Sequence, residues 1–437
     1  MAVRSGRHPP FLMAPDICIA EPPNTMMGSC MNDQGIQSRA RQGAQHEIRS
    51  PELTMISKTN RSRDVFHPLC LNPSSHWRRL RKLHPRVDAA FADRARSIAW
   101  VSPLMTAMGA IERMVYGRAI RREPLVHDPV FVIGHWRSGT TLLHSIFSKD
   151  PQFGYVTLFQ TLAPGAFLAG RRSLQPLLAL RAPDTRPMDN VKIRMPYPSE
   201  EEFALAHLCP QSAYLGWYFP SDWPELFAKF ALMRGMTSEE TAEWRSAYRE
   251  LLVKATINFS GRRLVLKNPM NTARIDALLE MFPNAKFIHI YRNPHDVFRA
   301  TLHFFREVLK VTTLQEISDA RIQEYVLDFY PRVMNAYWEQ RDNIPAGNHV
   351  EVRYEDLVAD PLVEVERIYG ELQLGGWSDA LGPVEKFLAS RVSHHRNRYS
   401  SDLRQRELVE ERWGFAFDRL GYDRRSTGEG AALSAGA

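Results

Sequence analysis

The stretch PVFVIGHWRSGTTLLHSIF, residues 129–147, constrains the fold of this chain more than any other part of the sequence. It begins with Val130–Ile133, an apolar run with the length and composition of a buried β-strand. A small polar loop containing Gly134 and Gly139 follows, and then an apolar pattern with helical spacing. A loop between a strand and a helix points backbone N–H groups at one place, where the helix dipole adds positive potential. The stretch therefore predicts an α/β protein with an anion-binding loop.

Three later segments read as further strands. They are RRLVLKNP, AKFIHIYRNP and HVEVRYEDL, at residues 262–269, 285–294 and 349–357. TARIDALLEMFP, between the first two, predicts a helix, and residues 155–258 and 363–422 have mostly helical patterns. Strands separated by helices predict a central, mainly parallel sheet flanked by helices.

Composition divides the 437 residues into four segments. Residues 1–62 are rich in Pro, Gly, Ser, Asn and Arg and lack periodicity, which predicts a disordered tail. Residues 63–128 place apolar residues between basic ones at helical spacing, which predicts a helical segment packed on the main domain. A basic amphipathic stretch of this kind also allows peripheral contact with a membrane surface. We expect the main domain over 129–424 and a flexible tail over 425–437.

Charge and cysteine content exclude few classes of function. The net charge of +7 suits an anionic ligand, although solubility alone explains it equally well, and we expect no nucleic-acid partner. The four cysteines lack CxxC spacing and predict neither a disulfide scaffold nor a metal site. The most apolar long window, residues 97–117, is interrupted by Pro103 and by Glu112, so we expect no transmembrane span. With no signal-peptide pattern at the N-terminus, the prediction is a cytoplasmic protein.

The polar loop departs from nucleoside-triphosphate loops at one position. Its two glycines have the GxxxxG spacing of such loops, but Thr140 stands where they carry lysine. A cation lies inside the loop instead, at Arg137, and a guanidinium suits an anion with several oxygens. Ser138 and Thr141 add hydroxyl groups. On these residues alone, a glycine turn that only connects strand and helix remains an alternative.

GHWRSGTTLLH resembles the loop with which sulfotransferases bind the 5′-phosphosulfate of 3′-phosphoadenosine-5′-phosphosulfate (PAPS). The cytosolic enzymes have lysine in the place of Arg137, whereas carbohydrate, tyrosylprotein and many bacterial members have arginine. The resemblance extends over about residues 63–424 and implies a P-loop nucleoside-triphosphate-hydrolase-like fold, PAPS as donor and no metal. The residues that it implies for the 5′ end of the donor are Gly134, Arg137, Ser138, Gly139, Thr140 and Thr141.

FIHIYRNPHDVFRATLHFF, residues 287–305, resembles the 3′-phosphate site of the same family. There, an arginine at a strand end and a serine eight residues later bind the phosphate. The arginine corresponds to Arg292, but the serine position holds Ala300, so we predict that the neighbouring Thr301 supplies the hydroxyl. A late basic segment with Arg396 and Arg398 resembles the part of the family that closes over the nucleotide.

Sulfuryl transfer resembles phosphoryl transfer, in which positioned charges stabilise an in-line displacement and a base accepts the proton of the acceptor. We expect Arg137 to stabilise the leaving phosphate and the sulfuryl oxygens. Lys267, at the end of LVLK, corresponds to a family lysine that contacts the bridging region. The histidine base of other members is absent, because Pro269 and Asn271 stand at the two positions where it occurs.

The segment YPSEEEFALAHL offers carboxylates as a replacement for that histidine. Acidic residues at a helix N-terminus favour the helix dipole, which is the commonplace explanation of such a cluster. A carboxylate near an apolar acceptor pocket can also have its pKa raised into a useful range for a base. We predict Glu202 as the base, with Glu201 second. His144 and His207 are weaker candidates, for which a structural role is the favoured interpretation.

Two other functions compete with a hydroxyl- or amine-directed sulfotransferase. A P-loop kinase would show GK[ST] in the loop and an apolar strand ending in aspartate, which we do not find. A catalytically inactive nucleotide-binding module of the same fold is the stronger alternative, because the histidine is absent and Ala300 replaces a serine. The acceptor class stays open between small molecules, glycans and lipids, and the sequence does not predict the oligomeric state.

Overall fold

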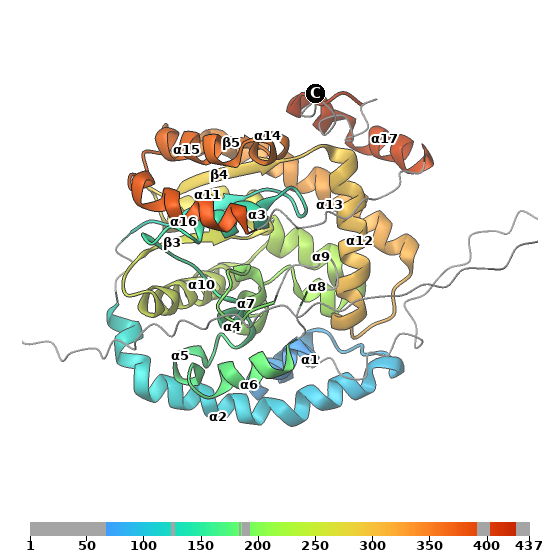
Figure 1. The fold of residues 1–437 in the computed structure, drawn as a ribbon. Coiled ribbons are helices and arrows are strands. Elements are labelled where there is room, and N and C mark those ends of the chain that lie inside the picture. Colours follow the sequence, from blue (N-terminus) through green and yellow to red (C-terminus); the bar gives the residue numbers. More distant parts are fainter. Residues whose placement is uncertain (1–66, 124–126, 183–184, 186–192, 391–402, 425–437) are drawn as a thin grey trace, which may run out of the picture. The chain divides into compact units, whose positions relative to one another are not determined.

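The computed structural model describes residues 67–123, 127–182, 185, 193–390 and 403–424 (Figure 1). In this part of the chain, a five-stranded sheet has the order β2–β3–β1–β4–β5, and each neighbouring pair is parallel. The strands are β1 (Val130–Ile133), β2 (Phe153–Gly154), β3 (Arg263–Lys267), β4 (Lys286–Tyr291) and β5 (His349–Arg353). The predicted parallel sheet is therefore confirmed. The sequence does not predict β2, because two residues carry no periodicity.

Helices cover both faces of the sheet and form most of the long middle section. Those of the first half are α1 (Ser74–Leu83), α2 (Ala92–Arg122), α3 (Thr140–Phe147), α4 (Leu158–Leu162), α5 (Phe167–Gly170), α6 (Leu174–Arg181), α7 (Glu201–Leu208), α8 (Leu215–Tyr218) and α9 (Trp223–Leu226). Those that follow are α10 (Ser238–Asn258), α11 (Ile275–Met281), α12 (Pro294–Thr312), α13 (Asp319–Gln340), α14 (Tyr354–Ala359), α15 (Pro361–Glu371), α16 (Trp377–Ala389) and α17 (Leu403–Leu420). HVEVRYEDL is thus a strand only in its first half, since its second half begins α14.

The alternation of side chains along β1 separates two apolar cores. Val130 and Val132 face one side of the sheet, where α3, α14, α15 and α16 pack against them. Phe131 and Ile133 face the other side and join a larger core with α10, α12, α13 and α17. Because both faces are covered, each residue of β1 is buried, which explains why the strand reads as a continuous apolar run.

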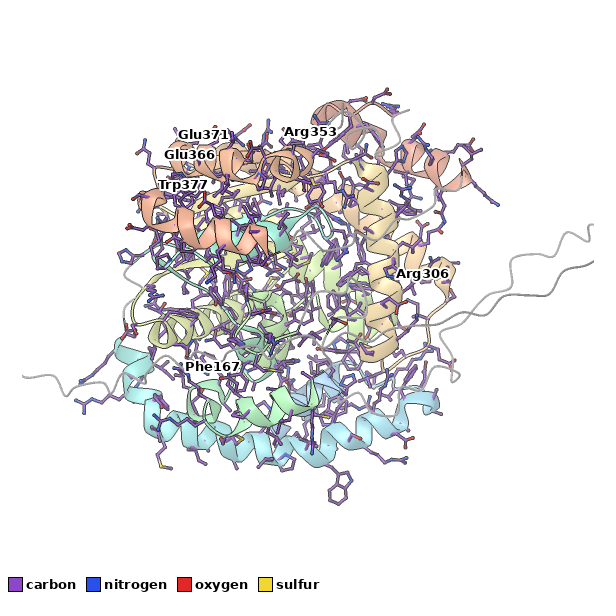
Figure 2. The ribbon with its side chains drawn as sticks, in the orientation of Figure 1. Phe167, Arg306, Arg353, Glu366, Glu371 and Trp377 are labelled. Carbon is purple, nitrogen blue, oxygen red and sulfur yellow. The ribbon has the colours of Figure 1, made fainter. Side chains whose placement is uncertain are left out.

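The helical segment before the sheet consists of α1 and α2, with a break after Leu83 where the sequence predicts a continuous helical pattern. A buried ion pair between Glu112 of α2 and Lys254 of α10 fixes α2 to the body. The Glu112 carboxylate also accepts hydrogen bonds from the backbone N–H groups of Leu168 (2.7 Å) and Ala169 (3.1 Å) at α5. Phe167 of α5 is labelled in Figure 2, and the centroid of its ring lies 4.6 Å from the Lys254 ammonium nitrogen. No helix in the described ranges combines the length and the apolar character needed to cross a membrane.

Candidate active site

The register of the sheet brings three functional segments to one edge. Val132 of β1 pairs with Lys267, the last residue of β3, and Ile133 pairs with His289 of β4. The loop after β1 therefore lies between Lys267 on one side and Arg292, which follows β4, on the other. Ligands of parallel α/β sheets bind at this carboxyl edge.

The two loop glycines occupy positions that no other residue fits. Gly134 and Gly139 have φ angles of 144° and 109°, in a region that side chains disfavour. A Cβ atom on Gly134 would lie 2.3 Å from the carbonyl oxygen of Ile290. A Cβ atom on Gly139 would lie 2.4 Å from the ring of Tyr354. The glycines thus let the loop approach β4 and α14 closely.

Hydroxyl groups hold the backbone of the loop in place. The Gly134 N–H donates to Thr272 Oγ1 at 2.7 Å, and Ser138 Oγ donates to the carbonyl oxygen of His135 at 2.7 Å. Thr301 Oγ1 donates to the carbonyl oxygen of Trp136 at 3.4 Å, and its side chain is completely buried. Thr301 therefore supports the loop from behind, and its predicted contact with the donor remains a prediction.

Arg137 has a left-handed backbone conformation, with φ of 67°. Such a conformation costs a residue other than glycine roughly 1–2 kcal/mol, and it is typical of functional loops. The guanidinium carbon lies 5.9 Å from the ring centroid of Phe304 on α12. The side chain thus leaves the loop toward α12.

Arg292 is linked to the loop through one aromatic ring. Its guanidinium lies 4.5 Å from the ring centroid of Tyr354, the same ring that contacts Gly139. It also pairs with Asp296 at 2.9 Å, one turn into α12. Asn293 caps α12 by accepting from the N–H of His295 at 2.9 Å. A guanidinium and a helix N-terminus therefore lie together beside the loop, as an anion site requires.

A chain of polar contacts connects both ends of the loop through α7. Lys267 forms an ion pair with Glu200 and donates to Thr141 Oγ1 at 3.4 Å. Glu200 accepts a hydrogen bond of 2.5 Å from the Tyr214 hydroxyl, which accepts one of 3.0 Å from the Trp136 indole. Burial and then the charge of Glu200 raise the pKa of Tyr214 well above its usual value, so this hydroxyl stays protonated.

Glu202 lies in a second, fully buried cluster. Its carboxylate accepts two hydrogen bonds from Arg274 (2.6 and 3.1 Å), one from Asn268 (2.8 Å) and one from Ser212 (2.8 Å). The backbone N–H of Ala213 donates a further bond at 3.1 Å. Burial alone would raise the pKa of Glu202, but the charge of Arg274 and these hydrogen bonds outweigh it and lower the pKa. Glu202 is therefore ionised, with both oxygens engaged.

Glu201 has the opposite environment. Its side chain is fully buried, and neither carboxylate oxygen has a hydrogen-bond partner within the described part of the chain. Burial is the main cause that raises its pKa to about 8, against smaller opposing effects of the residue's own backbone N–H and of the Lys267 charge. Glu201 is therefore mainly protonated at neutral pH.

The two histidines near the site are held in apolar surroundings. His144 bonds with the carbonyl oxygen of Val265 at 3.2 Å, and His207 bonds with the hydroxyl of Tyr218 at 3.2 Å. Burial is the main cause that lowers the pKa of each to about 3. Arg396 and Arg398, predicted to close over the nucleotide, lie outside the described residues.

Three parts of this site are not predicted from the sequence: Trp136, Tyr214 and Arg274. Tyr214 and Arg274 have no local motif, since their roles depend on segments far apart in the chain. Trp136 stands inside the quoted loop, but its indole reads as an apolar side chain until its partner is known. The choice among the three adjacent glutamates likewise depends on tertiary contacts.

A family model described as "Sulfotransferase family" matches residues 129–379, more than half of the chain. This chain belongs to the sulfotransferase family, and its reaction class is the transfer of a sulfuryl group. The omega-hydroxy-beta-dihydromenaquinone-9 sulfotransferase Stf3 of Mycobacterium bovis is 31% identical over 328 residues, which cover 75% of this chain and 84% of that protein. The same protein of Mycobacterium tuberculosis matches equally well.

Two solved structures share the fold. Sulfotransferase STF9 from Mycobacterium avium has a TM-score of 0.59 at 15% identity and covers 81% of this chain and 97% of its own. Sulfotransferase STF1 from Mycobacterium tuberculosis has a TM-score of 0.55 at 16% identity and covers 78% and 93%. The α/β architecture predicted from the sequence is thus the sulfotransferase architecture.

Proposed function

We propose that this enzyme transfers the sulfuryl group of PAPS to a hydroxyl group, with Glu200 as the general base. The observation that carries the proposal is the single edge that holds the glycine loop, Lys267, Glu200 and Arg292. The loop N–H groups and Arg137 would hold the 5′-phosphosulfate. Arg292 and the N-terminus of α12 would hold the 3′-phosphate. PAPS supplies the activated sulfuryl group, and none of these protein groups requires a metal.

The contacts of the three glutamates favour Glu200 over the residues that the sequence ranks first. Glu202 has both oxygens bound to the Arg274 cluster, and Glu201 is neutral at neutral pH. Glu200 is paired with Lys267 and is 14% exposed at its side chain, whereas Glu201 and Glu202 are completely buried. A base must reach the acceptor, so partial exposure distinguishes Glu200.

In the proposed step, the Glu200 carboxylate accepts the proton of the acceptor hydroxyl as that oxygen attacks sulfur. The new O–S bond forms while the bond from sulfur to the 5′-phosphate oxygen breaks, and adenosine 3′,5′-bisphosphate leaves. Lys267 contacts both Glu200 and Thr141, so its positive charge lies between base and loop, where charge develops on the leaving oxygen. Arg137 supplies a second positive charge from within the loop.

We further propose a hydroxyl-bearing, lipid-like acceptor. The support is the relative from Mycobacterium, which covers three quarters of this chain and is named for an omega-hydroxy menaquinone. A hydroxyl at the end of an apolar molecule also fits a carboxylate base that is only partly exposed.

Calorimetric titration of the whole protein with adenosine 3′,5′-bisphosphate, and with ATP in the presence and absence of magnesium, tests the donor site. We expect the bisphosphate to bind and Arg292→Ala to weaken it by about 10- to 100-fold, as for hydrogen bonds to charged groups. Arg306→Ala is the matched control, because Arg306 lies on the same helix, α12 (Figure 2), and pairs with Asp319. A preference for magnesium-ATP would refute the proposal.

A sulfate-transfer assay separates an enzyme from an inactive module. Radiolabelled PAPS is incubated with a hydroxylated menaquinone and with simple phenols and alcohols. We expect transfer to at least one of these acceptors. Intact bisphosphate binding without any transfer or donor hydrolysis would favour the inactive nucleotide-binding module.

A further inference from the structure

Helix α2 carries a row of large apolar side chains on its outer side. Trp100, Leu104, Ile111 and Met114 are 84%, 60%, 53% and 82% exposed, and Val115 is 63% exposed. Their spacings of three, four and seven place them on one face of the helix. Exposed apolar side chains are ordinary when they are scattered, but a contiguous row is typical of an interaction surface.

The attachment of α2 to the body does not require this row. The buried residues of α2 repeat at spacings of three and four on its opposite side, and they include Ile98, Met105, Gly109 and Glu112. Glu112 forms the buried ion pair with Lys254. A helix that is apolar on both sides is expected inside a protein or at a membrane, so the outer row lacks the contact that its composition favours.

A second helix, which lies alongside α2, also carries exposed apolar side chains. Leu177 and Leu180 of α6 are 47% and 85% exposed. The end of α5, just before α6, lies against α2, because a Cβ atom on Gly170 would be 3.3 Å from Cε of Met108. Figure 1 shows α5 and α6 running alongside α2. We call this surface the α2–α6 face; it consists of Trp100, Leu104, Ile111, Met114, Val115, Leu177 and Leu180.

Positive charge surrounds the α2–α6 face. The exposed arginines of α2, α6 and the turn before α6 are Arg96, Arg113, Arg118, Arg121, Arg122, Arg171, Arg172 and Arg181. The acidic residues of the same elements are Asp93, which pairs with Arg96, and the buried Glu112. A cavity of about 710 Å³ adjoins α6, and its lining includes Arg171, Arg172 and Arg194. The rim thus presents guanidinium groups, which bind phosphate oxygens well.

We propose that the α2–α6 face docks on the surface of a bilayer that contains anionic lipids. The apolar row, with Trp100 as its most exposed member, would enter the interfacial region, while the arginines contact lipid phosphates. A second copy of the chain is a poorer occupant, because pairing two such faces brings eight exposed arginines together, whereas the acidic residues beside them that are not buried are Asp93 and Glu123. Docking at this face does not depend on the identity of the donor.

Vesicle flotation with the full-length protein tests the docking surface. We expect binding to phosphatidylcholine vesicles that contain about one third phosphatidylglycerol, weaker binding to pure phosphatidylcholine, and loss of binding as salt increases. The double variant Trp100→Ser with Met114→Ser should lower the partition coefficient at least about tenfold, since two large apolar side chains no longer enter the bilayer. Val363→Ser and Leu403→Ser, at exposed apolar positions elsewhere, are the matched controls.

The charged rim is tested separately with Arg118→Gln, Arg121→Gln and Arg122→Gln combined. This variant should lose the preference for anionic vesicles and retain its calorimetric affinity for adenosine 3′,5′-bisphosphate.

Absence of vesicle binding by the folded wild-type protein would overturn the proposal. A dimer in light scattering that dissociates in the Trp100 and Met114 variant, without vesicle binding, would assign the face to a second copy. If the wild-type protein binds vesicles but does not bind adenosine 3′,5′-bisphosphate, only the donor proposal is refuted.

Discussion

Two cation–carboxylate pairs flank the start of α7, and they differ mainly in burial. Lys267 and Glu200 are 3% and 14% exposed at their side chains, and they lie beside the phosphate loop. Arg274 and Glu202 are both completely buried, and further hydrogen bonds saturate the Glu202 carboxylate. Glu200 and Glu202 lie only two positions apart in the chain.

Under the proposed mechanism, the pair of Lys267 and Glu200 takes part in the reaction, and the pair of Arg274 and Glu202 stabilises the fold. A carboxylate with every lone pair engaged can neither reach an acceptor nor take its proton without breaking the cluster. A pair with some exposure can exchange its partners when substrate arrives. Adjacent residues of one type thus acquire different roles through the elements that pack on them, and each prediction below tests this distinction.

The largest effect is expected for Glu200→Gln. The amide retains an acceptor oxygen for Lys267 and Tyr214 but cannot accept the proton of the substrate. We expect kcat to fall by 10²- to 10⁴-fold, as is usual for loss of a general base. Transfer of labelled sulfate measures kcat, and calorimetry with the bisphosphate checks that the donor site is unchanged.

Glu250→Gln, at an exposed position on α10, serves as the control for Glu200→Gln. If Glu200→Gln keeps the full kcat, the base lies elsewhere, and Glu202 or Glu201 regains the role that the sequence assigns to it.

The buried pair of Arg274 and Glu202 should contribute to the stability of the fold and not to catalysis. Arg274→Met leaves Glu202 as an uncompensated buried charge, so the free energy of unfolding should fall by about 3–5 kcal/mol. Urea denaturation measures this change. Arg245→Met removes one partner of the exposed pair with Glu280 and should cost no more than about 1 kcal/mol. Equal losses in the two variants would contradict the contrast between the buried pair and an ordinary surface pair.

The variant Tyr214→Phe tests whether the Tyr214 hydroxyl positions Glu200. Tyr214→Phe removes the hydrogen bond of 2.5 Å that stabilises the ionised carboxylate. We expect kcat to fall roughly tenfold, because a hydrogen bond to a charged group contributes about 1.5–3 kcal/mol and its loss leaves Glu200 less firmly positioned.

The control for Tyr214→Phe is Tyr325→Phe, since the Tyr325 hydroxyl is also buried and donates to the Pro220 carbonyl oxygen at 3.0 Å. This variant should change stability without lowering kcat. A merely structural Tyr214 would give the same result as Tyr325.

The sequence predicts the framework of this protein well because its signals are local. The strand Val130–Ile133 is found at its predicted limits, since a continuous apolar run followed by a glycine loop has few other solutions. Lys267 ends β3, and Arg137 and Arg292 follow β1 and β4. Parallel strands bring such residues to one edge of the sheet.

The roles of the glutamates escape prediction because they depend on distant segments. Arg274 and Tyr214 lie 72 and 14 residues from their respective carboxylates. The sequence EEEF does not show which glutamate pairs with an arginine, which pairs with a lysine, and which pairs with neither. The contact of Thr301 with the donor remains a prediction. In the structure, this side chain donates to the Trp136 carbonyl oxygen.

The burial of Glu201, which lies between Glu200 and Glu202 in the chain, should make the stability of the protein depend on pH. Its pKa is raised from 4.5 to about 8 in the folded protein, mainly by burial, so the folded state keeps a proton that the unfolded state releases. Between these values, the free energy of unfolding should fall by up to about 1.4 kcal/mol per pH unit as pH rises, and the stability present below pH 4.5 is lost by about pH 8. Urea denaturation between pH 5 and pH 8 measures the slope, and Glu201→Gln should flatten it because an amide does not titrate. An unchanged slope in Glu201→Gln would mean that Glu201 is ionised in the folded protein, and this residue would then compete with Glu200 for the role of base.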